Sequence, residues 1–475
     1  MRSNPKLILT AVLLSTVSLP ITLTGASVAL PDIAADLNAE LTSVQWVVTG
    51  YNATFASFIL ACGAIADIVG RRRMYAIGVA LFAATGLISA AANDIVLLDV
   101  ARALAGVGGA AAAASGSALL AASFEGPART RAFGLFGTTL GVGLAFGPTI
   151  AGMLVDTFGW RATFTAPALV ALVVLALAPG IPESKDPTGR RVDLPGTLTF
   201  TGFLLLLILA VMEGPRQGWA SLLVLGAFAA SAAVLVCFII VERRQDTPMF
   251  DIGLLRSRRF LAFSAAAATI LSILIPLLIY LPSYFTGVLG MTSGQAGATL
   301  ILLTSPALVL PMVGSVITRW ITPTAVVVAA VVLVGLGAAW LTIIKPGIST
   351  LALAGPLLSI GVGMGVTTGM IDGVALASVE TRRAGTAAGM LNTARLASET
   401  IAIAILGAVL ASTTGGRLAD PGYTRGLHIT LWGMSVLAAV TVLLIAVLLR
   451  PRSTTALEPA KLPGGDSRVR RIGSR

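Results

Sequence analysis

Arg102, Asp372, Arg395 and Glu399 are charged side chains inside long apolar stretches of the sequence. A charge at the centre of a bilayer costs roughly 2.5–3.5 kcal/mol even on the mild insertion scale, so such a residue usually has a function. A carboxyl group can take up and release a proton, whereas a guanidinium stays charged at any accessible pH. Glu399 and Asp372 are therefore candidates for proton coupling, and Arg102 and Arg395 are candidate buried cations.

The position of Glu399 favours it over Asp372 as the coupling residue. It lies about thirteen residues into its apolar stretch, near the middle of a bilayer at about 1.5 Å of rise per residue. Burial favours the neutral form of a carboxyl group, whereas a close cation favours the charged form. We hypothesise that Glu399 alternates between a proton-bound state and pairing with Arg395, four residues before it. The alternatives are a permanent Arg395–Glu399 ion pair and, for Asp372, a place in the wet interface.

Membrane-spanning helices must position these charges. The chain has 475 residues, of which 56% are hydrophobic and 11% are charged, whereas about 25% of the residues of soluble proteins are charged. The net charge of +11 comes from arginines scattered between apolar stretches, so no nucleic-acid partner is predicted. Cys62 and Cys237 indicate no disulfide framework, and His428 is the only histidine. No metal, no cofactor and no enzymatic centre is predicted.

Apolar stretches of about 20 residues, long enough to cross a bilayer core of about 30 Å, recur along the chain. The first resembles a signal peptide at its start but runs on to Pro31, so it is predicted to be an uncleaved span. The sequence predicts an all-α integral membrane protein with fourteen transmembrane helices. They are expected at residues 7–31, 44–66, 74–92, 95–121, 132–156, 161–180, 194–213, 219–241, 260–284, 295–318, 324–343, 350–371, 386–411 and 427–449.

The distribution of Lys and Arg predicts the orientation. If the N-terminus is inside and the loops alternate, most of the 32 Lys and Arg residues fall on the inner side, as the positive-inside rule requires. Both termini are then cytoplasmic. The protein is expected to be a multi-pass monomer in the lipid bilayer of a bacterial cytoplasmic (inner) membrane.

Two longer polar segments, 182–196 and 241–260, divide the spans into groups of six, two and six. We therefore expect an N-terminal six-helix bundle over residues 1–181. A linker and an inserted helix pair follow over 182–241, and a cytoplasmic linker with a C-terminal six-helix bundle over 242–450. Residues 451–475 lack apolar periodicity and are expected to form a disordered cytoplasmic tail.

The stretch GAIADIVGRRR joins the second span to the third on the expected cytoplasmic side. A basic anchor at the anionic lipid surface would explain its three arginines alone, but not the spacing of its glycines and aspartate. The whole pattern resembles the loop signature of the major facilitator superfamily, with Ile68 where that family often has a basic residue. Its residues in this chain are Gly63, Asp67, Gly70, Arg71, Arg72 and Arg73.

Other stretches resemble the fourteen-span drug:proton antiporters of that superfamily. RALAGVGGA, which begins at Arg102, is similar to a fourth-span pattern, with Ala105 in place of a glutamine. GVGLAFGPTIAG is similar to the fifth-span antiporter signature, and plain tight helix packing is the alternative explanation. Its residues are Gly143, Gly147, Pro148 and Gly152, with the proline as a kink. The resemblance covers residues 7–449.

This resemblance implies the major-facilitator fold and a secondary active exporter of small amphipathic compounds, such as drugs or antibiotics. Export would proceed by alternating access, coupled to proton antiport. The loop signature would form a cytoplasmic latch, in which Gly63 and Asp67 meet the start of the thirteenth span near Gly385. Two alternatives stay open: a dedicated exporter of one endogenous metabolite or antibiotic without proton coupling, and, more distantly, a membrane-embedded enzyme or sensor.

One departure from the family concerns proton coupling. The antiporters usually carry an aspartate in the middle of the first span, and the matching stretch ITLTGASVALP has Thr22 at that position. If the family's aspartate carries protons, coupling in this chain must use another residue or be absent.

Overall fold

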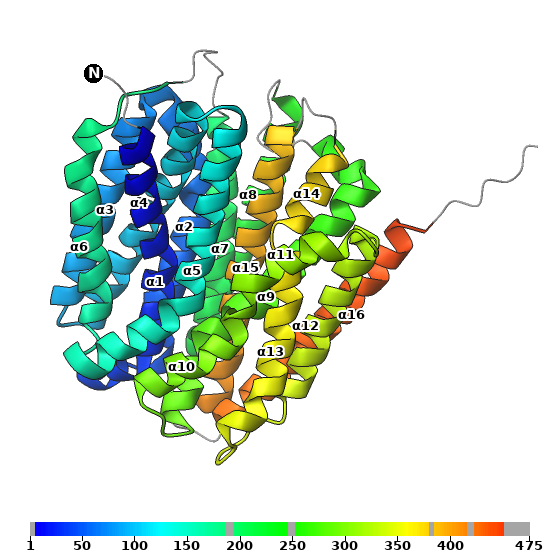
Figure 1. Ribbon diagram of the computed structural model, residues 1–475. Helices are drawn as coiled ribbons and strands as arrows, with labels where there is room; N and C mark the ends of the chain where they lie inside the picture. The colour runs from blue at the N-terminus through cyan, green and yellow to red at the C-terminus, as the bar shows by residue number, and fades with distance from the viewer. Residues whose placement is uncertain (1–4, 186–192, 246–251, 380–383, 416–421, 451–475) are drawn as a thin grey trace, which may run out of the picture.

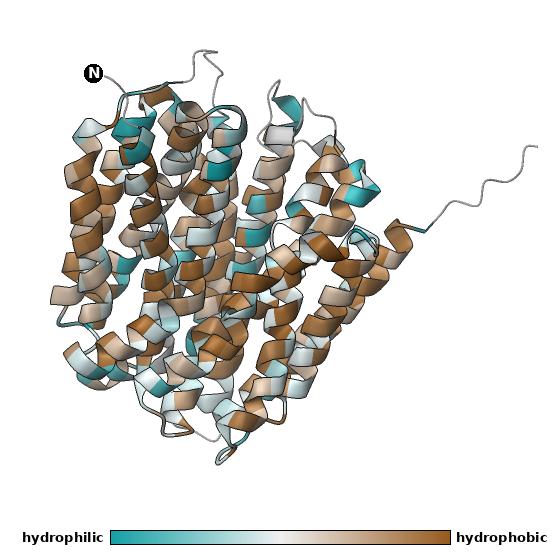
Figure 2. Ribbon diagram, viewed as in Figure 1, coloured by the Kyte–Doolittle hydropathy of each residue, from teal (hydrophilic) through white to brown (hydrophobic). Residues whose placement is uncertain are grey.

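A computed structural model describes residues 5–185, 193–245, 252–379, 384–415 and 422–450. Within these ranges every regular element is a helix, and fourteen helical segments are long and apolar enough to cross a membrane. The predicted all-helical fold with fourteen spans is therefore confirmed. The helices run side by side between two ends of the molecule (Figure 1). Apolar residues cover most of their length, and polar residues gather towards the two ends (Figure 2).

Helices α1 to α6 form the N-terminal half. Small residues let them pack closely: a side chain at Gly106 of α4 would overlap the Tyr51 carbonyl of α2, and one at Gly108 would lie 2.7 Å from the Phe82 nitrogen of α3. The bounds are α1 Pro5–Asp36, α2 Leu41–Val69, α3 Arg71–Ala91, α4 Ile95–Ser123, α5 Gly126–Phe158 and α6 Ala162–Leu177, followed by the short η1 Ala178–Gly180.

The second and third spans are joined by one residue and not by the loop that the sequence predicted. Helix α2 continues to Val69, and α3 begins at Arg71. Only Gly70 lies between them, with φ of 119°, a conformation that glycine adopts without steric cost. The apolar stretches end earlier than the helices because a helix can continue into the polar interface, where its charged residues meet water.

Helices α9 to α16 form the C-terminal half, and two of its spans are interrupted. The tenth breaks at Ser305, because Pro306 has no backbone donor. The twelfth ends at Thr367, and Gly369, with φ of 78°, leads into α14. Both predicted spans are present, and the breaks inside the tenth span and at the end of the twelfth were not predicted. The bounds are η2 Ile252–Arg256, α9 Arg258–Gly287, α10 Ser293–Thr304, α11 Pro306–Ile317, α12 Pro323–Leu341, α13 Thr350–Thr367, α14 Met370–Ala377, α15 Ala384–Thr414 and α16 Gly422–Leu448.

The inserted pair, α7 (Leu194–Gln217) and α8 (Leu222–Arg244), packs on the rest of the molecule through α7. Helix α7 contacts both α2 and α15, so it touches both halves. Its Thr201 hydroxyl donates to the Ser57 carbonyl of α2 at 2.7 Å. Phe200 and Leu204 pack in one cluster with Ala53 of α2 and with α15 residues.

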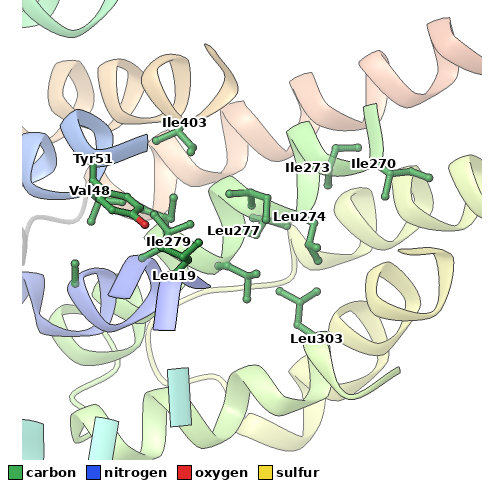
Figure 3. Close-up of a cluster of buried hydrophobic side chains, with 14 of the residues drawn as sticks. Leu19, Val48, Tyr51, Ile270, Ile273, Leu274, Leu277, Ile279, Leu303 and Ile403 are labelled. Atoms are coloured by element: carbon green, nitrogen blue, oxygen red, sulfur yellow. The ribbon is translucent and has the colours of Figure 1, made fainter. Parts of the chain in front are cut away.

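Helix α9 is the most enclosed span: 83% of the residues in its apolar stretch are buried inside the protein. It lies between the halves and contacts α1 as well as α15 and α16. Figure 3 shows its apolar side chains in one cluster with residues of both halves, among them Leu19 of α1, Val48 of α2 and Ile403 of α15. The two halves therefore share a hydrophobic core.

Candidate functional site

Asp372 and Arg395 form an ion pair on the wall of a cavity. Arg395 Nη1 lies 2.7 Å from Asp372 Oδ1. The break at Gly369 places Asp372 in the first turn of α14, opposite Arg395 on α15. The cavity has a volume of about 130 Å³. Its other lining residues are Ala267, Ile270, Leu271, Met364, Thr367, Thr368, Gly369 and Ile371.

Glu399 lies one helical turn further along α15 than Arg395. Its side chain is buried, and the Arg395 guanidinium acts on it electrostatically. Arg395 forms its ion pair with Asp372, so the alternative of a permanent Arg395–Glu399 pair is not the arrangement of this structure. The reason is that α14 brings a second carboxylate to the same guanidinium. Asp372, with a side chain 40% exposed, is the wetter of the two acids.

Arg102 is fully buried in the N-terminal half. Its Nε donates to the Val47 carbonyl of α2 at 2.9 Å, and its guanidinium lies 4.3 Å from the centre of the Tyr51 ring. The guanidinium also faces the ring of Phe164 at 5.3 Å. These contacts let a buried cation bridge α2, α4 and α6. Thr22 is buried too, and its hydroxyl has no hydrogen-bond partner among the described residues.

Asp99 is a charged residue of the fourth span that the sequence analysis passed over. It lies three residues before Arg102 on α4, and the two side chains interact electrostatically. Its Oδ1 is buried without a hydrogen-bond partner in the described part of the chain. Asp99 could have been identified from the sequence, because an acid three residues before an arginine on one helix can pair with it.

The arginines of the latch signature bind within the N-terminal half. Asp67 accepts from Arg71 Nε at 2.9 Å. The backbone nitrogen of Arg72 donates to Glu183 at 3.0 Å, and Arg73 lies 3.7 Å from the same carboxylate. Glu183, just after η1, was not among the predicted residues.

Among the described residues, Gly63 of α2 packs against the fourth span. A side chain at Gly63 would meet Ala114 of α4, at 3.7 Å, as its nearest neighbour. Gly385 belongs to α15, but the side chains at its start lie outside the described residues. The latch residues thus lie together, and their contact with α15 stays a prediction.

The glycines of the fifth-span signature face two different helices. A side chain at Gly143 would overlap the Pro20 ring of α1, and one at Gly147 would overlap the Thr24 hydroxyl. These two residues therefore pack α5 against α1 within the N-terminal half. Gly152 faces α10 instead, so the residues of the signature pack against two different helices.

The contact of α5 with α10 joins the two halves at one end of the molecule. A side chain at Gly152 would lie 2.8 Å from the Gly294 Cα. The Pro148 carbonyl oxygen lies so close to Gly297 of α10 that a side chain at Gly297 would overlap this oxygen. The Asp156 carboxylate accepts from the Gly294 nitrogen at 2.9 Å, and so caps the first turn of α10 from the other half.

Comparison with known proteins agrees with this architecture. The family model of the Major Facilitator Superfamily matches residues 12–403. The multidrug resistance protein Stp of Mycobacterium tuberculosis is 33% identical over 404 residues, which cover 84% of this chain and 75% of Stp. The puromycin resistance protein pur8 of Streptomyces alboniger is 32% identical over 438 residues, which cover 90% of this chain and 86% of pur8.

Among solved structures, a POT family transporter in complex with 5-aminolevulinic acid has the same fold, with a TM-score of 0.70. At 12% identity, over 93% of this chain and 96% of that one, this likeness supports the fold alone. Fold and family together define a multi-pass membrane transporter rather than an enzyme. The chain belongs to the major facilitator superfamily.

Proposed function

We propose that the protein is a secondary active exporter of small amphipathic compounds, driven by proton influx through alternating access. The relatives support export, because Stp and pur8 are named for resistance to drugs. The observation that carries the coupling is the arrangement of Arg395 between two carboxyl groups. It pairs with Asp372 and lies one turn from the buried Glu399.

The shared guanidinium can couple the two acids. While Arg395 pairs with Asp372, Glu399 lacks a full counter-charge, and its burial favours the proton-bound form. If Arg395 turns towards Glu399 while the cavity is open to the cytoplasm, the carboxylate is stabilised and the proton leaves on that side. One proton is then bound and released in each cycle without any change in the charge of the arginine.

The two halves are taken to be the bundles 1–181 and 242–450, with the inserted pair 182–241 bridging them. We place both termini in the cytoplasm of a bacterium, so that the α5–α10 contact lies at the outer face. At the opposite end, no described residue lies within 4 Å of where a side chain at Gly134, Gly137 or Gly141 of α5 would stand. This contrast between the two ends of α5 supports a state that is closed to the outside and open to the cytoplasm. We take the transporter to work as a monomer.

The orientation can be tested with reporter fusions. We expect reporters after Arg73, Arg191, Arg259 and Arg383 to be cytoplasmic, and one after Arg417 to be outside, because the basic residues follow the positive-inside rule. Alkaline phosphatase and fluorescent-protein fusions read the two sides. A single reversed reporter at Arg383 would contradict the assignment of spans in the second half.

Asp67→Asn is expected to lower transport at near-normal expression and to shift the population towards states open to the cytoplasm. The latch proposal requires the Asp67 charge to stabilise the state closed on that side, next to the start of α15. Maleimide labelling of a cysteine at Gly137 measures the opening. Asp36→Asn is the matched control, because Asp36 pairs with Arg161 within the same half at the other end. If Asp67→Asn leaves both the labelling and the transport unchanged, the latch proposal is wrong.

Transport itself is tested in proteoliposomes with an imposed pH gradient. We expect uptake of an amphipathic dye into inside-out-oriented vesicles when the lumen is acidic, and its loss when an ionophore collapses the gradient. Transport that continues undiminished after the collapse would contradict proton coupling.

Thr22 gives one reason to keep a second function in view. Because the first span lacks its usual acid, a dedicated exporter of one compound without proton coupling remains the rival. A drug-panel susceptibility test in a host without its own pumps separates the two. Resistance to a single compound favours the dedicated exporter, and resistance to many favours the broad one.

A further inference from the structure

A row of buried polar side chains lies on one face of α2. Gln45, Thr49 and Asn52 are spaced by four and three residues, so they share one side of the helix. Their exposed fractions are 1%, 0% and 3%. Both amide atoms of Gln45, the Thr49 hydroxyl and Asn52 Nδ2 have no hydrogen-bond partner among the described residues.

Such a group of unpartnered atoms needs a physical explanation. Leaving one buried polar group without a hydrogen bond costs about 1–3 kcal/mol, and most buried polar atoms in proteins are bonded to the protein or to ordered water. Three neighbouring residues with unpartnered buried polar atoms on one helix face point to a common partner. A site lined by several polar groups is one that water occupies, whereas an apolar cavity stays dry.

The row faces α15 and α9. A Cβ atom added at Gly407 of α15 would lie 3.1 Å from Gln45 Oε1, so the two residues face each other. The Tyr280 hydroxyl of α9 donates to the Ile403 carbonyl of α15 at 3.2 Å, and the Thr49 hydroxyl lies beside the phenolic oxygen of Tyr280. Figure 3 shows Val48, the neighbour of Thr49, in the same cluster as Ile403.

The register of the two helices leads the row towards Glu399. Helix α2 runs antiparallel to α15, because Gln45 lies opposite Gly407 and Ala53 packs in a cluster with Ala397. Glu399, Ile403 and Gly407 are each four residues apart, so they share one face of α15. Eight residues of helix separate Glu399 from the level of Gln45, or about 12 Å at 1.5 Å per residue.

We propose that Gln45, Thr49 and Asn52 hold a file of water molecules that carries protons between the outer end of the molecule and Glu399. About four waters at a spacing of about 2.8 Å span that length. Each water accepts one proton and passes on another, so the file is unchanged and one proton bonds to a Glu399 oxygen. The three side chains do not titrate; they are positioning residues for water.

The place of the row explains how the path is gated. Gln45 lies near the start of α2, at the end where α5 and α10 hold the halves together. That contact keeps the file away from outer water in this state. Glu399 therefore receives protons only after the outer end opens. This inference rests on the proposed proton coupling through Glu399.

The first test detects water and does not depend on transport. Brief X-ray radiolysis produces hydroxyl radicals from bound water, and mass spectrometry then finds the modified tyrosines. Tyr280 is only 1% exposed, so its modification in the full-length protein would require internal water. Tyr75, which is 0% exposed and donates to the Ala11 carbonyl, is the matched control. We expect Tyr280 to react about tenfold faster than Tyr75; equal rates would mean that the row is dry and would overturn the proposal.

The second test separates water positioning from a packing role. Thr49→Val and Asn52→Leu keep the approximate shape and remove the polar atoms. In proteoliposomes, we expect each variant to lose one water position and its proton-driven export to fall by about tenfold. Substrate exchange at equal pH should stay within about twofold of the wild-type rate. Thr85→Val, a buried threonine of α3 that bonds its own helix, is the control.

The outcomes can be told apart. If both variants melt at a higher temperature and export normally, the polar atoms are dry, and the proposal is wrong. If export and exchange fall together, the residues serve packing only, and it is wrong as well. If instead wild-type export needs no pH gradient, the proposed function fails, whereas the radiolysis result still decides whether water occupies the row.

Discussion

Glu399→Gln is expected to abolish export against a substrate gradient while substrate binding and exchange at equal pH remain measurable. Glutamine has nearly the shape of protonated glutamate, so the variant imitates the proton-bound state permanently. Glu399 is buried one turn from Arg395, and burial penalises a charged side chain more than a neutral one. Because Gln cannot release a proton, Arg395 has no anion to turn to and remains with Asp372. Substrate can still cross when its own gradient drives it.

The measurement compares gradient-driven export with exchange in the same proteoliposomes. Glu213→Gln is the matched control, because Glu213 is a carboxyl group within α7 that accepts from Trp46 and does not line the cavity of Asp372 and Arg395. It should leave both activities near wild type. If Glu399→Gln still exports uphill and stops when the pH gradient is collapsed, the coupling residue is another one. Asp372 is then the next to replace.

Most of the fold could be predicted from the sequence because a bilayer imposes one length on each span. The fourteen apolar stretches correspond to the fourteen helical segments, including the inserted pair flanked by Pro and Gly. The break at Gly369 could not be predicted from hydropathy, since the stretch stays apolar through it. It depends on the backbone conformation of one residue, with φ of 78°.

The sequence named Asp372, Arg395 and Glu399 as candidates, but it did not predict which of the two acids pairs with the arginine. Arg395 and Glu399 share a helix face by their spacing, so the sequence offered their ion pair as the alternative to a Glu399 that alternates between states. The structure brings Asp372 to the same guanidinium because α14 starts a new helix after Gly369. Contacts between helices far apart in sequence decide this choice, and no local spacing encodes them. The same holds for Gly152, whose partner on α10 lies more than a hundred residues away.

Gly152→Val is expected to reduce export by at least about tenfold and to hold the protein open to the outside. A side chain at this position would overlap the Ser293 carbonyl and lie 2.8 Å from the Gly294 Cα. Both neighbours are backbone atoms of α10, and backbone cannot turn away as a long side chain can. Overpacking of this kind costs typically about 1–3 kcal/mol. The helices can avoid that cost by separating, which is the outward-open state.

The position of the clash makes the effect specific to one state. Gly152 and Gly294 belong to opposite halves, so valine strains only the state in which the outer ends touch. Folding of the N-terminal half should be unaffected, because Gly152 meets α10 and not its own bundle. About 1–3 kcal/mol corresponds to a change of roughly five- to 150-fold in the ratio of the two states. Transport falls because the cycle cannot return to the cytoplasm-open state.

Labelling of a cysteine at Ser27 measures this shift in a variant without Cys62 and Cys237. Ser27 is fully buried and donates to the Leu278 carbonyl of α9 across the two halves, so a reagent reaches it only after they part. We expect the labelling rate from outside to rise about tenfold in Gly152→Val. Gly134→Val, on the same helix with open space around it, should leave the rate unchanged. Slow labelling in both variants, with full export, would mean that the α5–α10 contact is not the outer gate.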